Sequence, residues 1–148
     1  MSEAPLIVIV DDDELALDGI RDLVESLGYA AATFTSAEHF LKSAVIPQVT
    51  CLITDLQMPG QSGLELQEAL RSRGYQMPVI LITAYPNDKD RTRALNNGAI
   101  GFLSKPFDDR WLMECLTDAI KLHDKGGPGC CKTAIGVIGR DHHFKPIV

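Results

Sequence analysis

Three short runs of apolar residues constrain the fold of this chain more than any other feature of its sequence. They are Leu6–Val10, Cys51–Thr54 and Val79–Thr83, and they are rich in β-branched residues without alternating between apolar and polar side chains. This pattern is typical of strands that are buried on both faces, as in parallel sheets covered by helices on two sides. Two weaker strands are predicted at Ala31–Phe34 and Gly101–Ser104.

The segments between these runs carry helix signals. An apolar stripe between the first two strands stops at Gly28, and Ser36 is a candidate N-cap for the next helix. Ser62 and Glu65 form a capping-box pattern that opens a further helix. These signals place one helix after each of the first three strands.

The second half of the chain continues the alternation. Residues 88–97 have few apolar positions and predict a weak helix, whereas residues 112–120 carry a clear apolar stripe. Five strand–helix units in a row predict an α/β fold with a doubly wound parallel sheet and right-handed crossovers. In open sheets of this kind, ligands bind outside the carboxyl ends of the strands.

Polar side chains stand at the carboxyl ends of four predicted strands. They are Asp11, Asp12 and Asp13 after the first strand, Asp55 at the third, Thr83 at the fourth and Lys105 after the fifth. Crowded carboxylates repel one another, and a hard divalent cation such as Mg²⁺ relieves that repulsion. One carboxylate can then attack phosphorus, while Lys105 and Thr83 stabilise charge on the phosphoryl oxygens.

Each of these residues also has an ordinary structural interpretation. The acidic run suits a helix N-terminus, and Asp55 suits a turn before Met58-Pro59-Gly60. Thr83 would then satisfy its own backbone, and Lys105 would be a solvated surface charge. These residues stand at the ends of four different strands. One shared site is therefore a much more favoured explanation than four independent structural roles.

The combined motifs resemble the receiver domains of two-component response regulators, most of all those of the FixJ type (LuxR class). The matching residues are Val10-Asp11-Asp12-Asp13, Asp55 with Met58-Pro59-Gly60 and Gly63, Thr83-Ala84, and Lys105-Pro106-Phe107. The resemblance implies a receiver domain over residues 1–123, with a flavodoxin-like (CheY-like) sheet of strand order 2-1-3-4-5. Residues 124–148 are then expected to be a flexible tail or a truncated or vector-derived linker.

The resemblance also assigns the metal site and the phosphoacceptor. Asp55 would accept the phosphoryl group. Asp12, Asp55 and the backbone carbonyl of Gln57 would ligate Mg²⁺, for which Mn²⁺ can substitute, and Asp11 would hold the metal through water. Gln57 and Tyr85 occupy the two positions that tune the lifetime of the phosphoryl group in this family.

Four further expectations come from the same resemblance. Lys105 would contact the phosphoryl group, and its bond to Pro106 would be cis. Asp13 would cap the first helix rather than bind metal. Thr83 and Phe102 would form the switch pair, in which the Thr83 hydroxyl swings to a phosphoryl oxygen and the ring turns inward. Because phenylalanine has no hydroxyl, an ordinary core aromatic remains an equal alternative for Phe102.

The implied function is a phosphorylation-activated signalling switch. The domain would take a phosphoryl group from the phosphohistidine of a sensor histidine kinase and would catalyse only its own phosphorylation and dephosphorylation, so it is not otherwise an enzyme. The face made by the fourth helix, fifth strand and fifth helix would respond, with homodimerisation as one outcome. Transcription would be controlled through a DNA-binding domain that residues 124–148 are too short to supply.

Composition agrees with this interpretation. The net charge of the chain is −6, and residues 124–148 carry four basic and two acidic side chains. The acidic body therefore argues against direct binding of nucleic acid. No apolar run is long enough for a membrane span, no secretion signal precedes the first strand, and the four cysteines show no paired framework, so a reducing cytoplasm is expected.

Three alternatives are weighed against the switch. A phosphohydrolase would use Asp11 and Asp13 as a D-x-D pair, but Glu14 and the residues after it do not continue that motif. A flavin-binding module would need a Ser/Thr-rich phosphate loop after the first strand, where this chain has only acids. A degenerate receiver that only docks partners is the third alternative, but every expected phosphorylation residue is present in this chain. Separately from the switch, Cys130, Cys131, His142 and His143 suggest zinc, yet their adjacent spacing suits tetrahedral coordination poorly.

Overall fold

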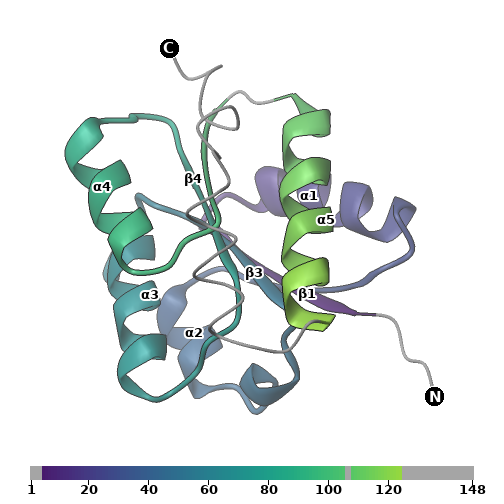
Figure 1. Cartoon of the computed structure of the whole chain (residues 1–148), viewed down its shortest axis with the longest axis horizontal. Helices are drawn as coiled ribbons and strands as arrows, with labels where there is room; N and C mark the ends of the chain where they lie inside the picture. Colours follow the sequence, from purple (N-terminus) through teal and green to yellow (C-terminus); the bar gives the residue numbers. More distant parts are fainter. Residues whose placement is uncertain (1–4, 106–107, 125–148) are drawn as a thin grey trace.

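Five parallel strands form one sheet in the computed structural model, which describes residues 5–105 and 108–124 (Figure 1). The strands are β1 (Leu6–Val10), β2 (Ala30–Phe34), β3 (Cys51–Asp55), β4 (Val79–Thr83) and β5 (Gly101–Ser104). Their spatial order is β2-β1-β3-β4-β5, which confirms the predicted order and the α/β class. The described helices are α1 (Glu14–Ser26), α2 (Ala37–Lys42), α3 (Gly63–Ser72), α4 (Asp88–Asn96) and α5 (Asp109–Asp124), with a short 3₁₀ helix at Ile46–Gln48.

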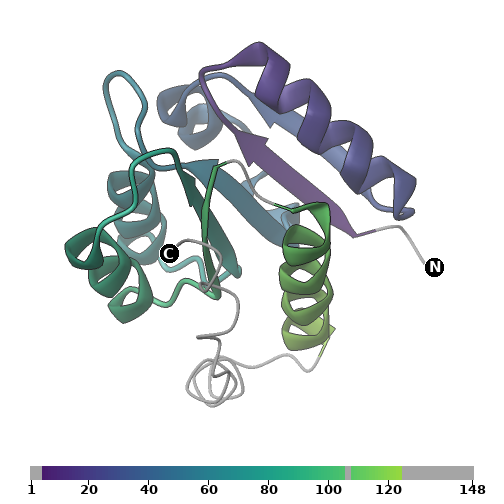
Figure 2. The same cartoon turned by 90° about the horizontal axis from the view of Figure 1, so that it is seen from above.

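The apolar strands divide their side chains between two cores. On one face of the sheet, Ile7, Ile53 and Ile80 pack with buried residues of α1 and α5. On the other face, Val8 and Leu52 pack with residues of α2, α3 and α4. Figure 2 shows the sheet lying between these two groups of helices. Burial on both faces is the reason that the strand sequences do not alternate.

The predicted helix caps are present. The Asp13 side chain accepts a hydrogen bond from the amide of Leu15, so Asp13 is the N-cap of α1 as predicted. Ser36 caps α2, and Ser62 with Glu65 form the complete capping box of α3. These caps fix where each loop turns back after the carboxyl end of a strand.

The loop between β3 and α3 is pinned closely to the end of the sheet. The amide of Leu56 donates to the carbonyl of Ile82 at 2.7 Å, and the amide of Gly63 donates to the carbonyl of Leu56 at 2.9 Å. A Cβ atom on Gly63 would collide with the carbonyl oxygen of Asp55. The start of α3 therefore lies against the backbone of Asp55, and glycine is required there.

Two predicted features lie outside the described residues. These are the cis peptide bond to Pro106 and the tail at residues 125–148, which includes the cysteine and histidine residues considered for zinc. Within the ranges 5–105 and 108–124, no helix combines the length and the apolar character that a bilayer crossing demands.

Replacing Gly63 with alanine should destabilise the fold, because the added methyl group meets backbone that cannot move aside. We expect a loss of about 1–3 kcal/mol in the free energy of unfolding, measured by urea denaturation. Gly19 in α1 is the matched control, since nothing lies within 4 Å of an added Cβ there. Gly19→Ala should be neutral or stabilising, and an equal loss in both variants would contradict the proposed steric cause.

Candidate functional site

Three carboxylates meet at the carboxyl edge of the sheet. Asp11 directly follows β1 and Asp55 is the last residue of β3. The two strands are neighbours, with Val10 paired to Thr54, so their ends coincide. Oxygen atoms of Asp11, Asp12 and Asp55 lie within 4.8 Å of one another. The sequence analysis thus predicted a real cluster, in which Asp11 and Asp55 are buried and Asp12 is exposed.

Lys105 supplies the positive charge of the cluster. Its Nζ atom lies 3.1 Å from Oδ2 of Asp11 and 3.7 Å from Oδ1 of Asp55. The amide of Lys105 donates to the carbonyl of Thr83 at 2.8 Å, which extends the β4–β5 pairing and holds the lysine at the sheet edge. The predicted lysine therefore contacts two of the three acids.

The surroundings of Asp55 disfavour the charged form of its carboxyl group. Burial, followed by repulsion from Asp11, raises the pKa of Asp55 to about 6, although the nearby Lys105 opposes this rise. Burial alone would lower the pKa of Lys105, but attraction to Asp11 and Asp55 holds it above its ordinary value. One lysine does not balance three carboxylates, and the site favours an additional positive charge.

The donor set fits a hard divalent cation. All three acids offer carboxylate oxygens, which are the ligands that Mg²⁺ prefers. Burial and then repulsion from Asp11 raise the pKa of Asp55, and the charge of such an ion would oppose both effects. Exposure of Asp12 leaves the cluster open to solvent on one side, so an ion could keep several waters.

Thr83 is fully buried and makes two hydrogen bonds. Its hydroxyl donates to Oε1 of Gln57 at 2.7 Å and accepts from the amide of Tyr85 at 2.9 Å. The sequence analysis assigned Gln57 a backbone role and a tuning role and missed this side-chain contact. Gln57 lies in the loop after β3 and Thr83 is the last residue of β4, 26 positions further along the chain, and no sequence signal pairs them.

Phe102 has no exposed surface and belongs to the core on the α3 and α4 side of the sheet. A buried ring agrees with an ordinary core aromatic and equally with the inward position of a switch residue. A rotamer change of Phe102 on phosphorylation stays a prediction.

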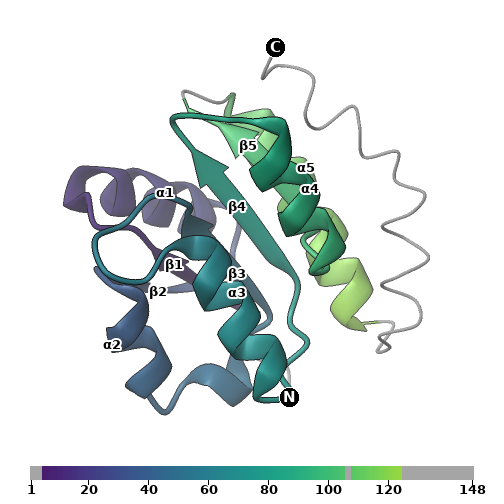
Figure 3. The same ribbon diagram turned by 90° about the vertical axis from the view of Figure 1, so that its left-hand side faces the viewer.

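Helices α3 and α4 lie side by side (Figure 3), and polar side-chain contacts join them on the surface. Arg93 donates two hydrogen bonds to the carboxylate of Glu68, at 2.8 and 2.9 Å, and the Asn97 amide donates to the same carboxylate at 3.0 Å. Hydrogen bonding from Arg93 is the main reason that the pKa of Glu68 lies below its ordinary value. The sequence analysis did not anticipate this network, which we call the α3–α4 clamp.

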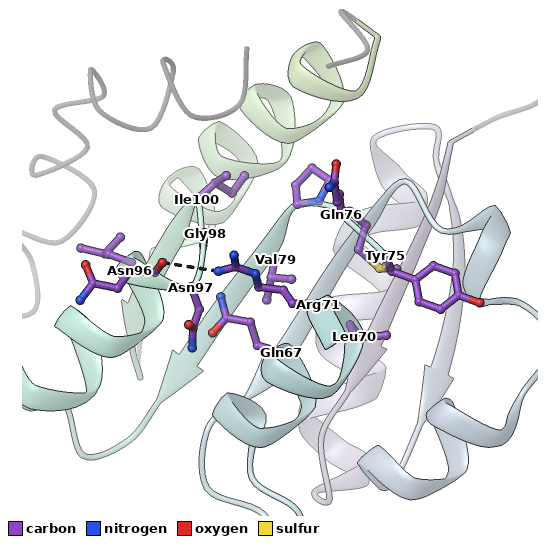
Figure 4. Close-up of a pocket in the computed structure, with 13 residues that line it drawn as sticks. Gln67, Leu70, Arg71, Tyr75, Gln76, Val79, Asn96, Asn97, Gly98 and Ile100 are labelled. Carbon is purple, nitrogen blue, oxygen red and sulfur yellow. Dashed lines mark hydrogen bonds between the residues drawn. The ribbon is translucent and has the colours of Figure 1, made fainter. Parts of the chain in front are cut away.

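A cavity of about 490 Å³ lies between α3 and α4 at the amino-terminal end of β4. In Figure 4, Gln67 and Arg71 both extend from α3 toward the end of α4. The Gln67 amide donates to the carbonyl of Ala94, while its buried Oε1 has no partner among the described residues. This cavity is at the opposite edge of the sheet from Asp55 and is separate from the acid cluster.

This fold, with acids and a lysine at the carboxyl edge of its sheet, defines a class of signalling domain. The family described as the response regulator receiver domain matches residues 7–117. The chain belongs to this family, whose members act in phosphorylation-dependent signalling as regulatory domains.

Similar proteins agree with that membership. The chain is 36% identical to the response regulator protein TodT of Pseudomonas putida over 119 residues, or 80% of this chain and 52% of TodT. It is 40% identical to the transcriptional regulatory protein FixJ of Azorhizobium caulinodans over 109 residues, or 74% of this chain and 52% of FixJ. The chain thus spans about half the length of these curated relatives.

Solved structures share the same fold. The response regulator StyR superimposes with a TM-score of 0.78 at 36% identity, covering 83% of this chain and 62% of StyR. FixJ-N superimposes with a TM-score of 0.72 at 33% identity, covering 82% of this chain and 96% of FixJ-N.

The raised pKa of Asp55 makes metal-free stability depend on pH. The pKa of the Asp55 carboxyl is about 6 in the folded chain, against an ordinary value of 3.8. Protonated Asp55 therefore contributes stability at low pH, and this contribution is lost as the pH rises from 3.8 to about 6. In EDTA, Asp55→Asn should abolish this loss and be more stable than wild type at pH 7 by about 1–2 kcal/mol. Thermal unfolding at pH 4 and pH 7 would measure it.

Asp18→Asn is the control for that measurement, since Asp18 is an exposed acid of α1 paired with Arg21. It should keep the pH dependence of the wild type. A stability difference between Asp55→Asn and wild type that is the same at both pH values would contradict the assignment.

Proposed function

We propose that Asp55 accepts a phosphoryl group from the phosphohistidine of a sensor histidine kinase. The observation that carries this proposal is the acid cluster with Lys105 placed between Asp11 and Asp55. An Asp55 oxygen attacks phosphorus and the P–N bond to histidine breaks. The released imidazole nitrogen takes up a proton from solvent and leaves as neutral imidazole. The product is an acyl phosphate that water later hydrolyses.

The neighbouring residues have distinct tasks in this transfer. Lys105, already 3.7 Å from Asp55, would move its ammonium group onto a phosphoryl oxygen. Thr83 would donate its hydroxyl proton to another oxygen. Asp12, Asp55 and the Gln57 carbonyl would hold Mg²⁺, or Mn²⁺ in its place, with Asp11 acting through water. When bound, the ion supplies positive charge against the charge that develops on the phosphoryl oxygens.

The α4–β5–α5 face is the proposed output surface. Ala94 is the one buried residue of α4, and the clamp that holds this helix to α3 consists of exposed or half-exposed polar side chains. A helix with one buried apolar residue and surface ion pairs costs little to shift. Phosphorylation would therefore bias an existing equilibrium of this face.

The proposed setting follows from the same function. The partner is a sensor histidine kinase, and the location is the cytoplasm. DNA would be reached only through an effector domain, as the FixJ relative is a transcriptional regulatory protein about twice as long as the matched region.

The contacts of Asp11 weigh against the phosphohydrolase alternative. Its Oδ1 accepts from the amide of Asp13 and its Oδ2 from Lys105, so both oxygens are engaged. Asp13 is occupied as the cap of α1. Asp55, by contrast, has the raised pKa, and its ion pair with Lys105, at 3.7 Å, is longer than that of Asp11, at 3.1 Å. Asp55 is therefore the better nucleophile candidate.

Incubation with acetyl phosphate and Mg²⁺ should add one phosphoryl group to the wild type, detected by intact mass. Asp55→Asn should add none, and Asp18→Asn should label like the wild type. Labelling that persists in Asp55→Asn would place the acceptor elsewhere and overturn the proposal.

Phosphorylation should also promote dimerisation through the α4–β5–α5 face. Beryllium fluoride with Mg²⁺, a stable phosphoryl mimic, is expected to raise the sedimenting mass of the wild type toward that of a dimer. Asp55→Asn should stay at its starting mass under the same conditions. An unchanged wild-type mass, with the mimic bound, would count against this output.

A further inference from the structure

The Thr83 hydroxyl has no proton left to give in this state. A threonine hydroxyl carries one proton and two acceptor positions. The amide of Tyr85 donates to the oxygen at 2.9 Å, and the single proton points to Oε1 of Gln57 at 2.7 Å. To donate to a phosphoryl oxygen, Thr83 must first release Gln57.

The hydrogen-bond pattern fixes the orientation of the Gln57 amide. With the amide reversed, its nitrogen would donate to the Thr83 oxygen, which already accepts from Tyr85. The hydroxyl proton of a fully buried side chain would then lose its partner. An unpaired buried donor is costly, so the carbonyl oxygen of Gln57 faces Thr83.

The backbone holds Gln57 where it can make this contact. The amide of Leu56 bonds to the carbonyl of Ile82, one residue before Thr83 in β4. The loop that follows Asp55 is thereby attached to the strand that carries Thr83. Gln57 itself is exposed, so its side chain is free to leave without disturbing the core.

We propose that the Gln57 side chain is a latch that holds the Thr83 hydroxyl in its unphosphorylated position, making Gln57 a positioning residue for the switch. The latch regulates the phosphoacceptor site and so rests on the function proposed above. Gln57 has two separate roles in this scheme, since its carbonyl would face the metal while its amide restrains Thr83.

Removing the latch should favour the active state. Gln57→Met keeps the backbone carbonyl and a similar side-chain length but removes the strong acceptor. A net hydrogen bond changes an equilibrium by roughly two- to tenfold. Beryllium fluoride binds the active state, and its apparent affinity is proportional to the population of that state. Destabilising the inactive state should therefore raise the affinity for beryllium fluoride by the same factor.

The experiment compares wild type, Gln57→Met and the matched control Gln61→Met by NMR of the labelled full chain. Gln61 lies in the same loop. Its backbone amide, rather than its side chain, donates a hydrogen bond to the carboxylate of Glu38. Two quantities are measured: the χ1 rotamer of Thr83 from its scalar couplings without ligand, and the dissociation constant for beryllium fluoride with Mg²⁺.

The latch predicts one fixed Thr83 rotamer in the wild type and in Gln61→Met, and rotamer averaging with two- to tenfold tighter binding of beryllium fluoride in Gln57→Met. Unchanged couplings and affinity in Gln57→Met would overturn it. If the wild type neither binds beryllium fluoride nor accepts phosphate, the proposed function fails instead. The ligand-free couplings of Thr83 would still decide whether Gln57 restrains the hydroxyl.

Discussion

Repulsion among the carboxylates of Asp11, Asp12 and Asp55 is the constraint on which the rest of the site depends. Two of these groups are buried, and Lys105 is the one cation in described contact with them. The strand ends bring the acids together, and burial, followed by repulsion from Asp11, raises the pKa of Asp55. A site with such repulsion responds strongly to any added cation or phosphoryl group.

The surroundings of the acid cluster differ in how firmly they are held. Beneath it, fully buried isoleucine, valine and leucine side chains fix β1, β3 and β4. Beside it, one hydrogen bond joins the Thr83 hydroxyl to the exposed Gln57 side chain, and the α3–α4 clamp holds α4. A rigid sheet with weakly attached neighbours lets a local change in charge move a surface without unfolding the domain.

The sequence predicted the parts of this structure that repeat a general rule. Parallel strands end at one edge, so Asp11, Asp55 and Lys105 were expected to meet. The cap at Ser62 followed from the local capping-box pattern, and the cap at Asp13 from the family resemblance. The 3₁₀ helix at Ile46–Gln48 was not expected, because the Pro47 turn has no period to detect. The contacts Gln57–Thr83 and Glu68–Arg93 depend on how two flexible side chains meet across loops or helices, and no spacing encodes that.

The ion pair between Lys105 and Asp11 joins residues 94 positions apart in the chain. Because Lys105 directly follows β5, this ion pair requires β5 to be in place in the sheet. A nascent chain that has not yet delivered β5 therefore has its acids but not its lysine. The complete set of charges at the site therefore exists only once the last strand of the sheet has docked.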